Sequence, residues 1–153
     1  MSKLTIIKAG NPELKETAKP VKTITKRIKK LLDDMAETMY AAEGVGLAAP
    51  QINESLQLVV LDDGNGLIEL INPEILEHSE EIVDGVEGCL SVPGYYGHVE
   101  RYEWVKVKAL NRRNKVVYYE PKGFLARIFQ HEIDHLHGVL FIEKAEDLRK
   151  VEQ

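Results

Sequence analysis

The sequence contains one cysteine, no long hydrophobic run and no excess of basic residues, and each absence argues against a class of protein. A single cysteine cannot form an internal disulfide, which is typical of a reducing compartment. The longest apolar runs, such as residues 58–61, are far too short to cross a bilayer. Residues 1–10 resemble neither a signal peptide nor a transit peptide. We therefore expect a cytoplasmic protein with no membrane partner.

The charge balance is slightly acidic, with 20 Lys and Arg against 25 Asp and Glu and a formal net charge of −5. This balance gives no reason to expect nucleic acid as a direct partner, although a bulk charge does not exclude a small basic patch. The length of 153 residues is that of one ordinary domain, and no repeat or linker divides it. We expect residues 1–153 to form a single domain.

Two segments have the apolar spacing of amphipathic helices. Residues 25–42 form the first, with Gly44 as its expected stop, and residues 124–137 form the second, ending at Gly138. A short helix is also expected over residues 144–153.

Residues 56–120 change to short β-rich runs separated by turn residues. The expected strands cover residues 56–61, 67–71, 75–83, 99–110 and 116–119. An order of helix, strands and helix indicates an α+β fold with mostly antiparallel pairing.

The strongest chemical signal lies in the second helix, where residues 131–135 read His-Glu-Ile-Asp-His. Side chains four residues apart share one helix face, with Cβ atoms about 5–6 Å apart, so His131 and His135 can bind one metal ion. Glu132 lies about 100° around the helix and can take a proton from water beside that ion. The alternative is a polar helix face that happens to contain two histidines. We expect antiparallel sheets packed around this helix as a central metal-binding helix.

A catalytic ion site needs a third protein ligand while one position stays open. Cys89, in the segment Glu-Gly-Cys-Leu-Ser at 87–91, is a candidate, although a lone cysteine is more often a small buried hydrophobe. Residues 44–51, Gly-Val-Gly-Leu-Ala-Ala-Pro-Gln, read by themselves as a helix stop followed by a turn.

Together, three segments resemble the motifs of the peptide deformylases, in the family's order and at about its spacing. They are residues 44–51, residues 87–91 and residues 130–135, which read Gln-His-Glu-Ile-Asp-His. The resemblance extends from about residue 6 to residue 142. It implies a hydrolase that removes the formyl group from N-formylmethionyl nascent peptides and releases formate.

The resemblance also implies a site. Cys89, His131 and His135 would bind one divalent metal ion, and Glu132 would act as the acid–base. Gln51 and the backbone N–H of Leu90 would stabilise the oxyanion, with Gly46 placing backbone close to the substrate. The donor set by itself favours Zn²⁺, whereas the resemblance implies Fe²⁺ in the cell, with Zn²⁺ or Ni²⁺ able to replace it.

Further residues are expected around this centre. Val45, Phe124 and Ile128 are candidates for the wall of an apolar methionine pocket, although the last two serve equally well as ordinary core. The family pairs the glutamate of the cysteine motif with a downstream arginine, which implies Glu87 with Arg101. Ser91 and Glu43 are further candidates for orienting a ligand histidine, although both fit a solvated face equally well.

Two rival functions share the histidine motif. A zinc endopeptidase would need an extended cleft and a downstream third ligand, for which His137, Glu143 and Glu146 are poorly spaced. A catalytically silent metal-binding module would not need Glu132 or Gln51. Many relatives carry a longer C-terminal helix than the fifteen residues that follow Gly138, so transient contact with the ribosome stays open.

Overall fold

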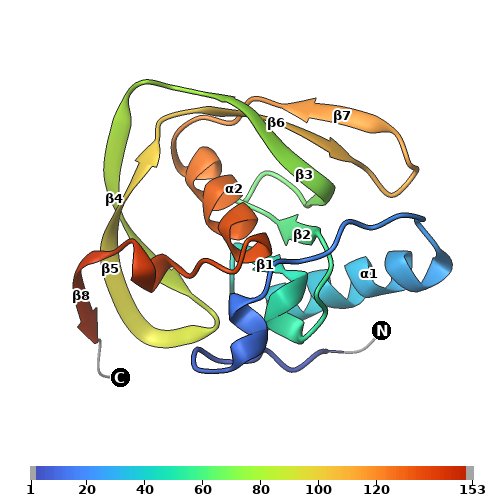
Figure 1. Cartoon of the computed structure of the whole chain (residues 1–153), viewed down its shortest axis with the longest axis horizontal. Helices are drawn as coiled ribbons and strands as arrows, with labels where there is room; N and C mark the ends of the chain where they lie inside the picture. The colour runs from blue at the N-terminus through green and yellow to red at the C-terminus, as the bar shows by residue number, and fades with distance from the viewer. Residues whose placement is uncertain (1–2, 151–153) are drawn as a thin grey trace.

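The computed structural model describes residues 3–150, which form the α+β fold expected from the sequence (Figure 1). The helices are η1 (Pro12–Lys15), α1 (Lys26–Ala41), η2 (Ala49–Ile52), α2 (Gly123–Leu136) and η3 (Phe141–Glu143), the η elements being 3₁₀ helices. The strands are β1 (Gly46–Ala48), β2 (Leu58–Leu61), β3 (Ile68–His78), β4 (Ile82–Cys89), β5 (Val92–Tyr102), β6 (Val105–Leu110), β7 (Val116–Tyr119) and β8 (Glu146–Lys150).

The strands form two antiparallel sheets. The larger sheet has the order β1-β2-β3-β6-β7, and the smaller has the order β4-β5-β8. Helix α2 contacts β1 and β2 of the larger sheet and β5 of the smaller one. In Figure 1 this helix lies between the β4–β5 hairpin and the larger sheet. Residues on α2 can therefore meet residues from both sheets.

Strand β2 is buried on both faces and separates the two main parts of the core. Leu58 and Val60 pack with the apolar residues of α1, whereas Val59 and Leu61 pack with those of α2. Alternate residues of a strand point to opposite faces, so the two helices cover opposite faces of the larger sheet. A third cluster, which includes Val99 and Phe141, lies under the smaller sheet.

Helix α1 matches its predicted extent closely. The Thr25 hydroxyl accepts a hydrogen bond from the Ile28 N–H at 3.3 Å and so caps the first turn. The stop differs from the expected one, because Glu43, not Gly44, adopts the left-handed conformation, with φ of 57°. Packing also favours glycine at position 44, since a Cβ there would lie 2.7 Å from the end of the Leu90 side chain, which would have to shift.

The predicted strands were wrong in several places, and they left out β1, most of β4 and the first part of β5. The expected strand over 75–83 is interrupted between His78 and Ile82, where the Ser79 hydroxyl donates to the Glu81 carbonyl. The runs at 67–71 and 75 onward are one strand, β3, which bends where Asn72 takes a φ of 53°. The run at 99–110 is two strands, β5 and β6, separated at residues 103–104.

The expected helix over 144–153 is also wrong for its described part. Residues 146–150 form β8, which pairs with β5 at Tyr95 and Tyr96. Tertiary pairing with an open sheet edge outweighs the weak helical propensity of this charged segment. Residues 151–153 lie outside the described part of the chain. Among the helices that are described, none is long and apolar enough to span a membrane.

Candidate metal centre and active site

Cys89, His131 and His135 bring three metal-binding atoms together, all within 4.8 Å of one another. The thiol comes from the end of β4 and the imidazoles from one face of α2. The Cys89 Sγ lies 3.3 Å from the His135 Nε2. A sulfur and two imidazole nitrogens are a donor set that suits zinc and other first-row divalent ions. The residues present therefore fit the metal ion that the sequence implies.

Burial and charge affect the two histidines in opposite directions. Burial, together with the charges of His131 and Arg101, holds the pKa of His135 well below its ordinary value, so this imidazole is neutral. Burial also lowers the pKa of His131, but hydrogen bonds to Cys89 and Glu87 and the charge of Glu132 raise it to about 10. The two imidazoles therefore differ in how strongly they hold a proton.

Glu132 lies beside this cluster and is almost completely buried. Its Oε2 is 4.0 Å from the His131 Nε2, and its Oε1 has no hydrogen-bond partner among the described residues. Burial raises the pKa of Glu132 to about 7, despite the lowering effect of the nearby His131 charge. A Cβ at Gly46 would lie 2.5 Å from Oε2, so only glycine lets β1 pass this close to the carboxylate.

Gln51, in η2, has its side-chain amide held in one orientation. Its Oε1 accepts a hydrogen bond from the Ala48 N–H at 2.9 Å, and its Nε2 donates to the Ser91 hydroxyl at 3.1 Å. The same Nε2 lies 3.5 Å from the Cys89 Sγ. The amide nitrogen therefore lies between Ser91 and the Cys89 sulfur of the metal-binding cluster. Ser91 positions Gln51, and the expectation that it contacts a ligand histidine was wrong.

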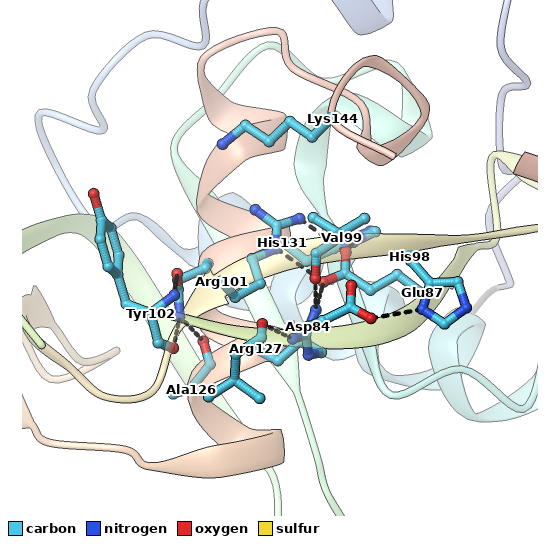
Figure 2. A network of polar contacts seen from close by, with 12 residues as sticks. Asp84, Glu87, His98, Val99, Arg101, Tyr102, Ala126, Arg127, His131 and Lys144 are labelled. Atoms are coloured by element: carbon cyan, nitrogen blue, oxygen red, sulfur yellow. Dashed lines mark hydrogen bonds and ion pairs between the residues drawn. The ribbon is translucent and has the colours of Figure 1, made fainter. Parts of the chain in front are cut away.

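Glu87 is the centre of a buried polar network that reaches the ligand His131 (Figure 2). Arg101 donates two hydrogen bonds of 2.8 Å to its two oxygens, and the His131 Nδ1 lies 2.8 Å from Oε1. Burial would raise the pKa of Glu87, but these hydrogen bonds outweigh it and hold the pKa well below its usual range. The ionised carboxylate fixes the ring so that Nε2 faces the other two metal-binding atoms.

Three residues of this region were not found from the sequence. Arg127 donates to Glu87 Oε2 at 2.6 Å, and Asp134 accepts from Arg101 at 2.6 Å. Gln130 hydrogen-bonds both the N–H and the carbonyl of Tyr102 and thereby ties α2 to β5. The sequence could have indicated these residues, because all three lie within or just before the histidine motif. Residues that flank metal ligands on a helix often fix the orientation of those ligands.

A cavity of about 570 Å³ opens beside the metal-binding cluster. Of the sequence candidates, it is lined by Gly46, Glu87, Cys89, Leu90, His131, Glu132, Val45, Phe124, Ile128 and Glu43. Ile128 is 4% exposed and belongs both to the hydrophobic core and to the cavity wall. Phe124 is 58% exposed, so the interpretation of Phe124 as ordinary core was wrong. The carboxylate that contacts a ligand histidine is Glu87, not Glu43.

A buried His-Glu-x-x-His helix with a cysteine beside it places the protein among metal-dependent hydrolases. A family model described as polypeptide deformylase matches residues 3–151. The chain belongs to the polypeptide deformylase family.

Individual relatives agree with this assignment. The chain is 58% identical to a peptide deformylase of Carboxydothermus hydrogenoformans over 94% of its length and 93% of the relative. It is likewise 58% identical to peptide deformylase 1 of Bacillus cereus, with the same two coverages. The crystal structure of the Thermotoga maritima peptide deformylase superposes with a TM-score of 0.94 at 45% identity, covering 95% of this chain and 99% of that one.

Proposed function

We propose that the protein hydrolyses the formyl amide of N-formylmethionyl polypeptides as they are made, acting as a single catalytic domain. The products are formate and a free N-terminal amine. The observation that carries this proposal is that Glu132, Cys89 and His131 line one cavity, while His135 and the Gln51 amide lie next to the Cys89 sulfur. Membership of the deformylase family supports the same reaction.

Cys89, His131 and His135 would hold one divalent ion. When bound, such an ion supplies Lewis-acid chemistry, since it polarises a carbonyl oxygen and makes a nearby water more acidic. The protein supplies the geometry through Glu87, which orients the His131 ring by its hydrogen bond to Nδ1. His135 is already neutral and needs no deprotonation to act as a ligand.

Glu132 is the general base and then the general acid. Its Oε1 has no partner among the described residues and is therefore free to accept a proton from the attacking water. As the C–N bond of the formyl amide breaks, the same carboxyl group delivers that proton to the leaving amine. A buried carboxyl group suits both steps, because burial brings its pKa close to neutrality.

Two hydrogen-bond donors stabilise the oxyanion that forms on the formyl carbon. One is the Gln51 amide, whose orientation is fixed by the Ala48 N–H. The other is the backbone N–H of Leu90, which lines the same cavity. Losing one such donor typically costs about 2.7–4 kcal/mol of transition-state stabilisation.

The cavity wall explains why a formyl group would be preferred. Backbone at Gly46 passes directly beside Glu132, which leaves little room for an acyl group larger than formyl. Val45, Ile128 and Phe124 provide an apolar surface for the methionine side chain. The family resemblance and this surface together support formylmethionine as the N-terminal residue.

A three-substrate assay tests the proposal. The protein loaded with metal is incubated with a formyl-Met peptide, the matching acetyl-Met peptide and a peptide with a blocked internal sequence. We expect formate release from the first and no reaction of the other two. Cleavage of the internal peptide would instead establish an endopeptidase, and metal binding without any turnover would establish a silent module.

Among residues 3–150, the structure places no downstream ligand of the kind that an endopeptidase of this motif would use. His137 follows the last residue of α2 and is exposed, while Glu143 forms an ion pair with Lys15. Glu146 lies on β8 and is exposed. The third donor next to the histidines is Cys89, which is the arrangement that the deformylase proposal requires.

We further propose that the ion in the cell is Fe²⁺. Thiolate and imidazole donors bind Zn²⁺ more tightly, so the proposal rests on family resemblance and concerns activity, not affinity. The test strips the metal, reloads Fe²⁺, Ni²⁺ or Zn²⁺, and measures deformylation with and without oxygen. The Fe²⁺ form should be the most active and should lose activity in air, since oxygen attacks iron and the Cys89 thiolate. Equal turnover with Zn²⁺ would reject iron and leave the deformylase proposal intact.

The proposed substrates also suggest where the protein acts. Nascent formylated chains emerge at cytoplasmic ribosomes, so we place the protein in the cytoplasm with a transient ribosome contact. Cosedimentation with ribosomes that carry a formylated nascent chain tests this contact, with empty ribosomes as the control.

A further inference from the structure

A second cavity of about 280 Å³ adjoins the substrate cavity in the groove between β4 and α2. Along β4, residues 83–86 line the second cavity and residues 86–89 line the first. Along α2, Gly123 lines only the second, whereas Ile128, His131 and Glu132 line only the first. The two cavities therefore follow one another along the same groove.

The residues shared by the two cavities are Val86, Phe124 and Arg127. Val86 and Phe124 are each 58% exposed, so they form the outer rim of the junction. The Arg127 side chain is only 11% exposed, so it forms the inner part. Arg127 is therefore the barrier between the end of the substrate cavity and the space beyond it.

Arg127 is held in this position by three separate partners, of which Glu87 and Val99 are labelled in Figure 2. Its Nη1 donates to Glu87 Oε2 at 2.6 Å and to the Val99 carbonyl at 2.9 Å, and its Nη2 donates to the Val83 carbonyl at 2.8 Å. The guanidinium group thus spans β4 and β5. It crosses β4 at Gly85, where a Cβ would lie 2.8 Å from the Arg127 Cζ. A barrier bound on three sides cannot swing aside at little cost.

We propose that Arg127 sets the length of the N-terminal side chain that the enzyme accepts. This inference rests on the proposed deformylase function and adds a specificity residue to it. An unbranched side chain of methionine length ends at the Arg127 barrier. Beyond it, Val83 and Tyr102 offer apolar surface beside the acidic Asp84 and Glu103, and a longer side chain reaches this surface only when the barrier is removed.

The test is a series of formyl peptides that differ only in the first residue, which is norleucine, 2-aminooctanoic acid or 2-aminodecanoic acid. The quantity measured is the ratio of kcat/KM for the longest substrate to kcat/KM for the norleucine substrate. Arg127→Ala should raise this ratio by about tenfold or more, since one methylene in a fitted pocket already changes kcat/KM by about tenfold. A ratio unchanged to within about twofold in this variant would overturn the proposal.

Gly85→Ala provides a second route that leaves Arg127 in the chain. The added methyl group displaces the guanidinium group from β4, so the ratio should rise again, by about threefold or more. This variant decides the question if Arg127→Ala does not fold, which circular dichroism shows. An unchanged ratio in a folded Gly85→Ala protein then overturns the proposal.

Arg101→Lys is the matched control. Arg101 also binds Glu87 but lines neither cavity, so this variant disturbs the Glu87 network without removing the barrier. Turnover of every substrate should fall by a similar factor, and the ratio should stay at the wild-type value. A ratio that rises as much as in Arg127→Ala would attribute the effect to the network and overturn the proposal. Failure of the deformylase proposal is separate, because the wild-type protein would then release no formate from any substrate.

Discussion

Helices α1 and α2 have similar lengths and cover opposite faces of the same sheet, yet they bury different chemistry. The buried face of α1 is mostly apolar, and its buried Thr38 both donates to and accepts from backbone. The buried face of α2 includes Gln130, His131, Glu132 and His135. Unpaired buried polar atoms cost stability, so their number and position on each helix matter.

The two helices also differ in where their unpaired buried atoms lie relative to the substrate cavity. On α2, Glu132 Oε1 and His135 Nδ1 have no partner among the described residues, and Glu132 lines the substrate cavity. On α1, Glu37 Oε2 likewise has no partner within residues 3–150, but Glu37 does not line that cavity. We therefore expect substitutions in α1 to change stability and substitutions in α2 to change chemistry.

Glu132→Gln should give the largest effect and change chemistry alone. Loss of a positioned acid–base typically lowers turnover by about 10²–10⁴-fold, while the three metal-binding residues remain in place. Formate release and metal content are measured on the same sample. Full turnover in this variant would show that Glu132 is not the base, and a lost metal would show that its role is structural.

Met35→Ala should change stability alone. Met35 is fully buried between α1 and the sheet, so its truncation should lower the free energy of unfolding by about 2–5 kcal/mol. Denaturant unfolding gives this value, and turnover per folded molecule should stay at the wild-type level. The exposed Lys29→Ala on the same helix is the control. A large loss of turnover in folded Met35→Ala would remove the contrast between the helices.

Glu87→Gln tests whether the network behind His131 acts on the metal. The amide cannot replace the carboxylate that accepts from His131 and two arginines, so metal affinity should fall by about 10–100-fold. Competition with a chelator of known affinity measures the change. Wild-type affinity in this variant would mean that the network only stabilises the fold.

The smallest effect concerns how the two helices begin. The Thr25 hydroxyl caps α1, whereas Lys122 makes no side-chain cap at α2. Thr25→Ala should lower the free energy of unfolding by about 1 kcal/mol, and Lys122→Ala by less than about 0.5 kcal/mol. Thermal unfolding of both variants gives the comparison. Equal effects would show that the packing of α1 makes its cap unnecessary.

The sequence predicted both helices to within a residue or two because their apolar periodicity and stop signals agree. It failed where tertiary pairing decides the structure, as at β8 and at the break between β3 and β4. It also could not predict where the Arg127 side chain lies. That side chain crosses β4 at Gly85, about forty residues earlier in the sequence, where only a residue without a Cβ leaves room for it. The histidine motif was readable because both histidines lie on one helix turn. Cys89 and Gln51 needed the family resemblance, since only the folded chain brings them there.

The metal-binding cluster has a consequence for how the chain folds. Cys89 and His135 are 46 residues apart in the sequence, and Gln51 and Cys89 are 38 apart. Such contacts form only after long loops have closed, which makes them late events in folding. A chain with α2 formed but β4 undocked would present two histidines and no thiolate, and would hold an ion weakly. Tight metal binding during refolding should therefore occur no earlier than the slowest structural phase, in which β4 docks against α2 and the native topology forms.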